Sequence, residues 1–272
     1  MRRFRLTVEY DGTDYAGFQW QPSPLRTVQA ELETAIAKVS GVTMRVHGAG
    51  RTDTGVHALG QVVHFDTDWA IPVERIAFAI NGELPRDIVV RNAKIVDTSF
   101  HARFSATSRT YRYTLWKGEQ RSAIFDRFAW HIRLPLDTPA MRRAAAELTG
   151  THDYATFGLP DEPGKSTLRH MDGWEFDERD RFLHLTVRGN AFLRSQVRAF
   201  IGTLVSVGLG KLNIADVVRI RDSRDRVFCP TIAPARGLTL LRVRYDGTRW
   251  THFGEGDTEP DGGIDKKDKT DE

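Results

Sequence analysis

Apolar and polar residues alternate along the first ten positions of the chain, which is the pattern of a half-buried strand. Phe4, Leu6 and Val8 are apolar, and the residues between them are polar or charged. Residues two positions apart lie on the same face of a strand, so these three side chains are expected to point into a core. The strand should end at the Asp11-Gly12 turn. Because this start lacks an unbroken apolar run, it is not expected to be a signal peptide.

Helical spacing begins at Val28, after which apolar residues recur every three or four positions as far as Val39. Thr27 suits the N-cap of this helix, and Gly41 suits its C-terminal end. Similar reasoning predicts the order β-α-β-β-α-β for the first half of the chain. Its other expected elements are a strand near residues 44–47, a loop at 48–60, a strand at 61–67, a helix that begins at Pro72, and a strand at 87–96.

The second half repeats this organisation. Its expected elements are strands at residues 108–116, 171–176, 182–187 and 238–245, and helices at 138–150, 191–207 and 214–220. Two split β-α-β units side by side predict an α/β (α+β) fold, with two ferredoxin-like halves that form a mainly antiparallel sheet with helices packed on it. We expect an N-terminal half at 1–106 and a C-terminal half at 107–253.

Charge is distributed unevenly between the body and the end of the chain. Residues 254–272 hold eight acids, three lysines and almost no apolar residues, which predicts a disordered acidic tail. This segment has a net charge of −5 in a chain of +3, so residues 1–253 carry +8. A basic folded body is expected of a protein that binds a polyanion such as RNA.

Cysteine content and hydropathy narrow the class of protein further. Cys229 is the only cysteine, which excludes an internal disulfide and a zinc site of several thiolates and suits a reducing compartment. The longest weakly polar run, 199–210, is too short to span a bilayer. We therefore expect a cytoplasmic protein that is not embedded in a membrane.

The sequence predicts neither a metal site nor a cofactor site. His47, His57 and His64 suggest a metal, but no carboxylate or thiolate stands at ligand spacing from them. The phosphate-binding pattern Gly-x-x-x-x-Gly-Lys and the dinucleotide fingerprint are both missing.

Candidate chemistry concentrates in segment 48–58, which reads GAGRTDTGVHA. Its three glycines allow the backbone to lie close to a ligand, and Arg51 and Asp53 are polar side chains held in that loop. Taken alone, the triplet Arg51-Thr52-Asp53 in a glycine-rich loop is also typical of a surface turn.

This segment resembles the catalytic loop of the tRNA pseudouridine synthases of the TruA family. The similarity extends over nearly the whole body, in the family's order, at residues 10–13, 17–19, 27–29, 60–65, 81–85, 100–106, 111–113, 190–192, 197–198 and 237–238. Two positions depart from the family's usual residues. Phe18 stands where Trp is common, and Gln196 stands where Met is common.

The resemblance implies an RNA-modifying isomerase that converts uridine to pseudouridine at positions 38, 39 and 40 in the anticodon stem-loop of tRNA. The C1′–N1 bond breaks, the base turns over, and C5 joins C1′. A homodimer and flipping of the base out of the RNA are also implied. Asp53 would be the catalytic carboxylate, as a nucleophile or as a base, because an anion can attack or stabilise an electron-poor anomeric carbon.

Three further site residues follow from the resemblance, each with an alternative. Arg198 would keep Asp53 ionised, or its head would simply extend from an apolar helix into water. Tyr111 would stack on the target base, or it would belong to an ordinary aromatic pair in the core. Arg51 would fill the gap left by the flipped uridine, or it would contact only a phosphate.

Two other functions fit the sequence less well. A non-catalytic RNA-binding module of ferredoxin-like fold should carry the signature Arg/Lys-Gly-Phe-Gly-Phe, which the sequence lacks. A nucleoside-hydrolysing glycosidase should show two cooperating carboxylates, whereas the key loop holds Asp53 alone.

Overall fold

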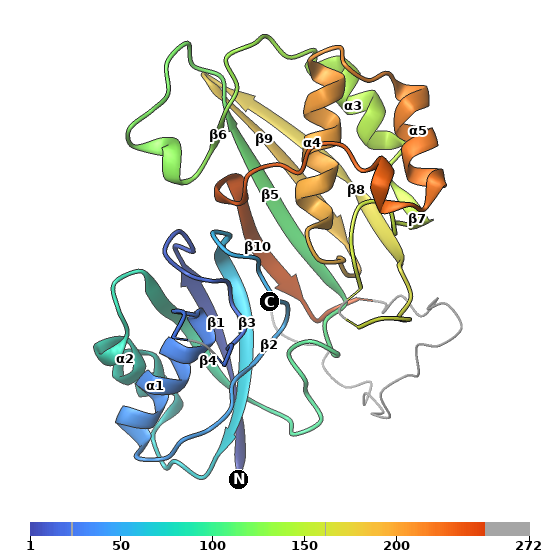
Figure 1. The fold of residues 1–272 in the computed structure, drawn as a ribbon. Helices are drawn as coiled ribbons and strands as arrows, with labels where there is room; N and C mark the ends of the chain where they lie inside the picture. Colours follow the sequence, from blue (N-terminus) through green and yellow to red (C-terminus); the bar gives the residue numbers. More distant parts are fainter. Residues whose placement is uncertain (23, 161, 248–272) are drawn as a thin grey trace.

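The computed structural model describes residues 1–22, 24–160 and 162–247, so the tail predicted at 254–272 lies outside the described residues. The described chain forms one ten-stranded, mainly antiparallel sheet with α-helices packed on it (Figure 1). The predicted fold class is therefore confirmed.

The first half follows the predicted β-α-β-β-α-β order. Its elements are β1 (Arg2–Tyr10), α1 (Val28–Ser40), β2 (His47–Gly48), β3 (His57–Thr67), α2 (Val73–Glu83) and β4 (Ile88–Val96). Strand β1 lies between β4 and β3, antiparallel to both, and β2 pairs with β3. The spatial order β4-β1-β3-β2 is that of a ferredoxin-like unit.

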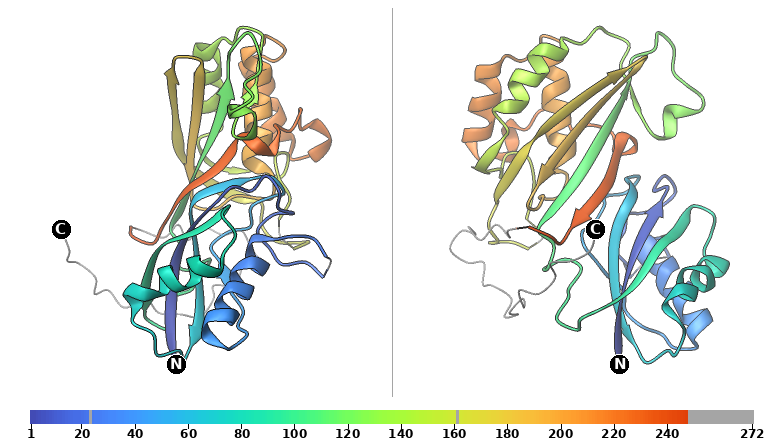
Figure 2. Two further views of the ribbon diagram at one scale, coloured as in Figure 1. Left: turned by 90° about the vertical axis from the view of Figure 1, so that its left-hand side faces the viewer. Right: turned by 180° about the vertical axis from the view of Figure 1, so that it is seen from behind.

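The second half repeats this plan with a few additions. Its main elements are β5 (Ser108–Trp116), α3 (Thr138–Ala146), β8 (Leu168–Arg179), β9 (Phe182–Gly189), α4 (Gln196–Gly208) and β10 (Leu238–Arg244), in the spatial order β10-β5-β9-β8. The additions are β6 (Trp130–His131), β7 (Gly150–Asp153), α5 (Ile214–Ser223) and three short 3-10 turns at Phe125–Arg127, Arg226–Phe228 and Ala235–Gly237. Helices α3, α4 and α5 lie on one face of this part of the sheet (Figure 2).

The two halves meet where β3 and β10 run parallel. His57 and Ala58 pair with Thr239 and Leu240, and a single cluster of buried apolar side chains extends through both halves. Gly60 permits this close approach, since a Cβ there would stand 2.4 Å from the carbonyl oxygen of Leu241. The loop that precedes β3 therefore lies against the second half.

Local sequence signals explain several of these elements. In α1, the Thr27 hydroxyl accepts a hydrogen bond from the Ala30 amide, Gly41 ends the helix at φ 73°, and Leu32 and Ile36 are buried. Among the described residues, no helix combines the length and apolarity needed to cross a membrane.

Several predicted boundaries near the candidate site were wrong. Helix α4 begins at Gln196 and not at 191, because Ser195 has a left-handed backbone (φ 63°) that interrupts a helix. The apolar residues just before Ser195 suggested a helix, but their side chains pack in a loop. Strand β2 has only two residues, and β3 begins at His57, so the predicted loop 48–60 shortens to residues 49–56, named here the Asp53 loop.

Candidate active site

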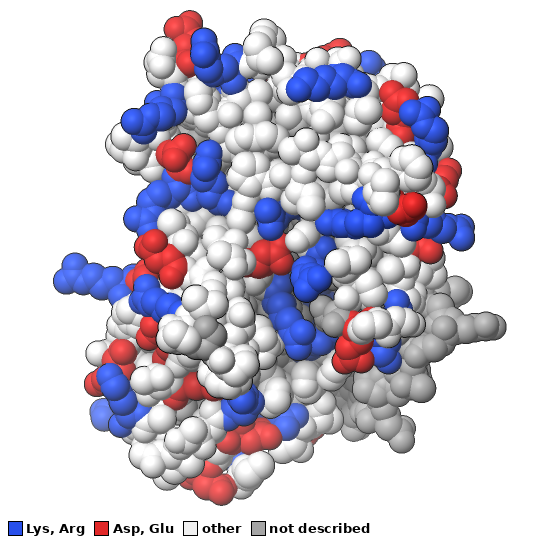
Figure 3. Space-filling model, viewed as in Figure 1, with Lys and Arg blue, Asp and Glu red and all other residues white. Residues whose placement is uncertain are grey.

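A cavity of about 790 Å³ opens between the two halves, a size that suits a nucleotide. Figure 3 shows Lys and Arg side chains gathered in the hollow at the middle of this face. Asp53 is the one acid among the described residues that line the cavity. The lining also contains six arginines, namely Arg45, Arg51, Arg103, Arg109, Arg169 and Arg194. The cavity therefore has the charge expected of a site for a polyanion.

The Asp53 loop is held in shape by backbone hydrogen bonds. The Phe18 amide donates to the Thr52 carbonyl oxygen at 3.1 Å, and the hydroxyls of Thr52 and Tyr10 lie 2.8 Å apart. The Val56 amide closes a turn onto the Asp53 carbonyl oxygen at 3.1 Å, with Gly55 at φ 77° in that turn. A side chain at Gly55 would be strained there, which explains the glycine after Thr54.

Asp53 is bound by two residues from the start of α4. Arg198 Nη1 donates to Asp53 Oδ2 at 3.0 Å, and Ser195 Oγ donates to the same oxygen at 2.9 Å. No residue that the structure describes donates a hydrogen bond to Asp53 Oδ1. Arg198 Nε donates to the Ala233 carbonyl oxygen at 2.8 Å, so its head is directed into the site and not out into water. The ion pair is about one-fifth exposed on each side.

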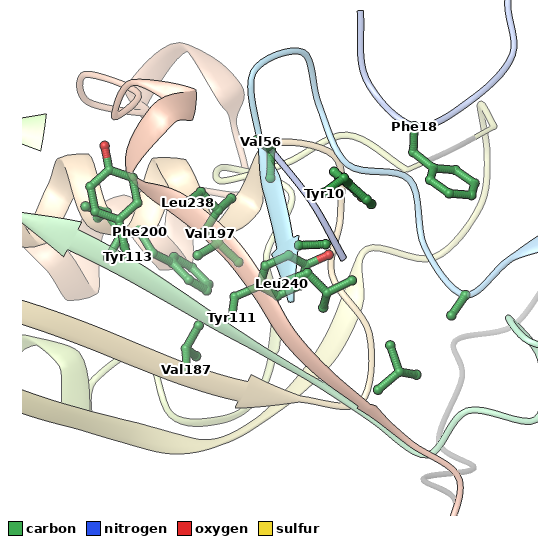
Figure 4. Packing of buried hydrophobic residues seen from close by; sticks show 14 of the residues in the cluster. Tyr10, Phe18, Val56, Tyr111, Tyr113, Val187, Val197, Phe200, Leu238 and Leu240 are labelled. Atoms are coloured by element: carbon green, nitrogen blue, oxygen red, sulfur yellow. The ribbon is translucent and has the colours of Figure 1, made fainter. Parts of the chain in front are cut away.

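Tyr111 and Arg51 lie in the same cavity. Tyr111 is buried in the middle of β5 and meets the Phe192 ring edge to face at 5.1 Å. Burial raises the pKa of Tyr111 to about 12, so its phenol stays neutral. Figure 4 shows Tyr111 among Leu240, Val197 and Val187, apart from Tyr113 on the same strand. Arg51 is exposed at the cavity wall. The structure thus brings all four predicted site residues together.

Sequence reasoning missed Ser195 and Arg109. Ser195 carried no local signal, because the segment around it was interpreted as helix. Arg109 lies on the same face of β5 as the buried Tyr111 and Tyr113. Its guanidinium donates to the carbonyl oxygens of Ala49 (3.1 Å), Arg103 (2.7 Å) and Asn190 (2.7 Å). It therefore ties the Asp53 loop to segment 100–106 and to the loop before α4. A charged residue at an inward position of a strand was the signal for such a role, since a buried guanidinium needs acceptors.

The three histidines considered as metal ligands do not come together. His47 and His64 stack at 5.0 Å between ring centroids, whereas His57 packs on Phe128 at 4.9 Å. Within residues 1–22, 24–160 and 162–247, no group of His, Cys, Asp and Glu is arranged to hold a metal. His101 is the residue that joins His64, at 4.6 Å between centroids.

Acidification is expected to destabilise the fold through His64 and His101. Burial, followed by the nearby His101 and His47, lowers the pKa of His64 to about 3, and burial lowers that of His101 to about 4. Both values lie below the ordinary 6.5, so the unfolded chain binds protons more readily. The contribution of the two neutral histidines to the stability of the fold is complete above about pH 6.5. It is lost as the pH falls toward their pKa values in the folded protein.

Between pH 7 and pH 5, the free energy of unfolding should fall by about 1 to 2 kcal/mol on account of His64. The His64→Asn variant can keep an acceptor for the Ala102 amide, which now donates to His64 Nδ1, but it does not titrate. Urea unfolding at both pH values should therefore show a smaller loss in this variant. Equal losses in the two proteins would contradict the assignment.

A carboxylate paired with an arginine, in an arginine-lined cavity between two ferredoxin-like units, suits an enzyme that acts on a nucleic acid. Residues 6–105 and 144–246 match the family model described as tRNA pseudouridine synthase. The chain belongs to the tRNA pseudouridine synthase family, whose members isomerise uridine to pseudouridine in tRNA.

Curated relatives match this chain over nearly its whole length. The chain is 43% identical over 245 residues to tRNA pseudouridine synthase A of Brevibacillus brevis, a match that covers 90% of this chain and all of the relative. It is 41% identical over 251 residues to tRNA pseudouridine synthase A of Geobacter sulfurreducens, with the same coverage. A solved H/ACA RNP bound to a substrate RNA aligns at a TM-score of 0.36 and 10% identity, over 88% of this chain and 46% of that one. That likeness is too low to carry any detail of the site.

Proposed function

We propose that this enzyme acts on uridines 38, 39 and 40 in the anticodon stem-loop of tRNA, with Asp53 as the reacting carboxylate. The ion pair between Asp53 and Arg198 in an arginine-lined cavity carries this proposal. An ionised carboxylate among cations, within reach of a phosphate-binding surface, suits attack on an anomeric carbon or removal of a C2′ proton.

The contacts of Asp53 divide its two oxygens between different tasks. Arg198 and Ser195 both hold Oδ2, which leaves Oδ1 to approach the C1′ or C2′ position of the substrate ribose. Tyr111, neutral and partly lining the cavity, stacks on the flipped uracil. Arg51, exposed at the wall, occupies the gap left in the RNA by the flipped nucleotide.

Tritium placed at C5 of single uridines tests the reaction and its position together. Isomerisation must release that tritium, because C5 forms the new bond to C1′, whereas mere binding or hydrolysis of the glycosidic bond need not. Release should occur from tRNA labelled at position 38, 39 or 40. Release only from uridines outside the anticodon arm would overturn the proposed targets.

The proposal includes the assembly and the location of the enzyme. Residues 1–106 form a domain that carries the Asp53 loop, and residues 107–253 form the domain that supplies Arg198. Two copies form a homodimer in the cytoplasm, and both contact the tRNA. Light scattering at the mass of one chain would contradict the dimer.

Ser195 is proposed as a positioning residue for Asp53. Replacing it with Ala removes one of the two hydrogen bonds to Oδ2, and a bond to a charged group is worth roughly 1.5 to 3 kcal/mol. The single-turnover rate of Ser195→Ala should therefore fall at least about tenfold, with little change in tRNA affinity.

Two control variants separate this hydrogen bond from effects on the helix. Ser195→Gly lacks the hydroxyl but adopts φ 63° without strain, so it should be as slow as Ser195→Ala and no less stable. Ser206→Ala removes a hydroxyl that donates to the Gly202 carbonyl within α4 and should keep the normal rate. A normal rate in both Ser195 variants would rule out the positioning role.

A further inference from the structure

Besides Phe18, three aromatic rings line the cavity on the side of the first half, and the reaction described above does not use them. They belong to His47, at the start of β2, and to His101 and Phe104, in segment 100–106. His101 lies 4.4 Å from Phe104 and 5.8 Å from His47, between ring centroids. Beneath them, His64 contacts both His101 and His47. We name His47, His101 and Phe104 the ring cluster.

His101, the middle ring of the cluster, is held in place by hydrogen bonds and is electrically neutral. His101 Nδ1 accepts hydrogen bonds from the amides of Arg103 (3.1 Å) and Phe104 (3.3 Å), so its proton resides on Nε2. Its lowered pKa keeps it neutral at pH 7. Ser105 strengthens this turn, because its hydroxyl accepts from the His101 amide at 2.9 Å.

The ring cluster also has a set position relative to Asp53. His47 and Gly48 form β2 and lead directly into the Asp53 loop. From the other side, Arg109 donates to both the Ala49 and the Arg103 carbonyl oxygens, which joins that loop to segment 100–106. A nucleotide bound on the rings would therefore keep a constant distance from the reacting carboxylate.

Phe104 contacts His101 but leaves much of its surface exposed. Its side chain is 44% exposed although it lines the cavity, and the Arg103 guanidinium lies 5.5 Å from its ring centroid. Exposed flat rings beside cations are the arrangement that binds unpaired nucleobases, because every base offers a flat π face and the phosphates need positive charge.

We propose that the ring cluster is a stacking subsite for the base next to the uridine that reacts at Asp53. Flipping the uridine unstacks its neighbour, and the ring of Phe104 replaces the lost stacking partner. The subsite accepts any base by its face and does not read its edge. This inference rests on the proposed function, since it assumes that a uridine is flipped into the Asp53 cavity.

The test uses tRNA that carries 2-aminopurine on the 5′ or on the 3′ side of the target uridine. Stacking on an aromatic ring quenches the fluorescence of this base. With the wild-type enzyme, one of the two labelled tRNAs should stay quenched when the uridine flips. Phe104→Ala should let the fluorescence of that tRNA rise, whereas Phe104→Trp should keep it quenched. The matched control is Phe78→Ala, since Phe78 on α2 is 81% exposed and does not line the cavity.

A missing base at the same position supplies a second, independent measurement. In the wild type, an abasic nucleotide there should raise KM about tenfold, the typical effect of losing one stacked base. In Phe104→Ala, KM should already be raised about tenfold, and the abasic nucleotide should add almost nothing. The value of kcat should change by less than about threefold in either case.

The outcomes separate the subsite from the reaction. The subsite would be overturned if quenching, and the rise in KM caused by the abasic nucleotide, were equal in wild type and Phe104→Ala. A loss of quenching in Phe78→Ala equal to that in Phe104→Ala would overturn it as well. Tritium release from the target uridine is followed in the same reactions. Tritium release by the wild type, together with equal quenching in the wild type and Phe104→Ala, counts against the subsite alone. No tritium release by the wild type counts against the proposed function.

Discussion

Replacing Asp53 with Asn should reduce pseudouridine formation to background while tRNA still binds. The amide keeps nearly the shape of the carboxylate but has no negative charge, so it can neither attack C1′ nor take the C2′ proton. Binding should survive because affinity for RNA comes mainly from many dispersed contacts with phosphates, such as the arginines of the cavity can make.

The measurement is the single-turnover rate on saturating tRNA, combined with filter binding at fixed salt. Asp66→Asn is a suitable comparison, because Asp66 also pairs with an arginine, Arg3, and does not line the cavity. That variant should keep its turnover. Substantial residual turnover in Asp53→Asn would overturn the catalytic assignment itself.

Replacing Arg198 with Met should slow the single-turnover rate about a hundredfold. Met matches much of the length of the side chain, but it leaves the Asp53 carboxylate with Ser195 as its only partner among the described residues. The loss of a charge-assisted hydrogen bond of roughly 2 to 3 kcal/mol corresponds to this change in rate. Tight binding of tRNA should persist, since Arg198 is not among the residues that line the cavity.

A double variant shows whether the two residues act as one unit. Arg198→Met combined with Asp53→Asn should cost little more than Asp53→Asn alone, because the arginine acts through the carboxylate. Arg198→Lys keeps a positive charge but lacks the fork that bonds both Asp53 and Ala233, so an intermediate rate is expected. A wild-type rate in Arg198→Met would remove the ion pair from the mechanism and leave Asp53 untouched.

Local patterns along the chain were enough to predict most of the fold. Alternation identified β1 and β5, and helical spacing with Thr27 and Gly41 at its ends identified α1. The same patterns misjudged the start of α4, since Ala191, Phe192 and Leu193 are apolar for another reason. They pack around the cavity from a loop whose end is set by the backbone of Ser195.

The site was only partly visible in the sequence. The Asp53 loop and Arg198 were recognised because their motifs resemble a family, whose expected pairing agrees with the observed 3.0 Å contact. Ser195 and Phe104 lie in the resembling region or beside it, yet nothing in their spacing predicted a hydroxyl bonded to Asp53 or a ring exposed in the cavity.

The sequence by itself determined the two ferredoxin-like units, the basic body and the loop that carries Asp53, because periodicity, charge and turn residues act over a few neighbouring positions. Only the tertiary structure decided which side chains meet that carboxylate. Ser195 and Arg198 stand 142 and 145 positions away from Asp53, and they reach it because β3 and β10 join the two halves edge to edge. Contacts over such separations depend on how the sheets dock, and docking depends on the packing of the whole core, which no local pattern records.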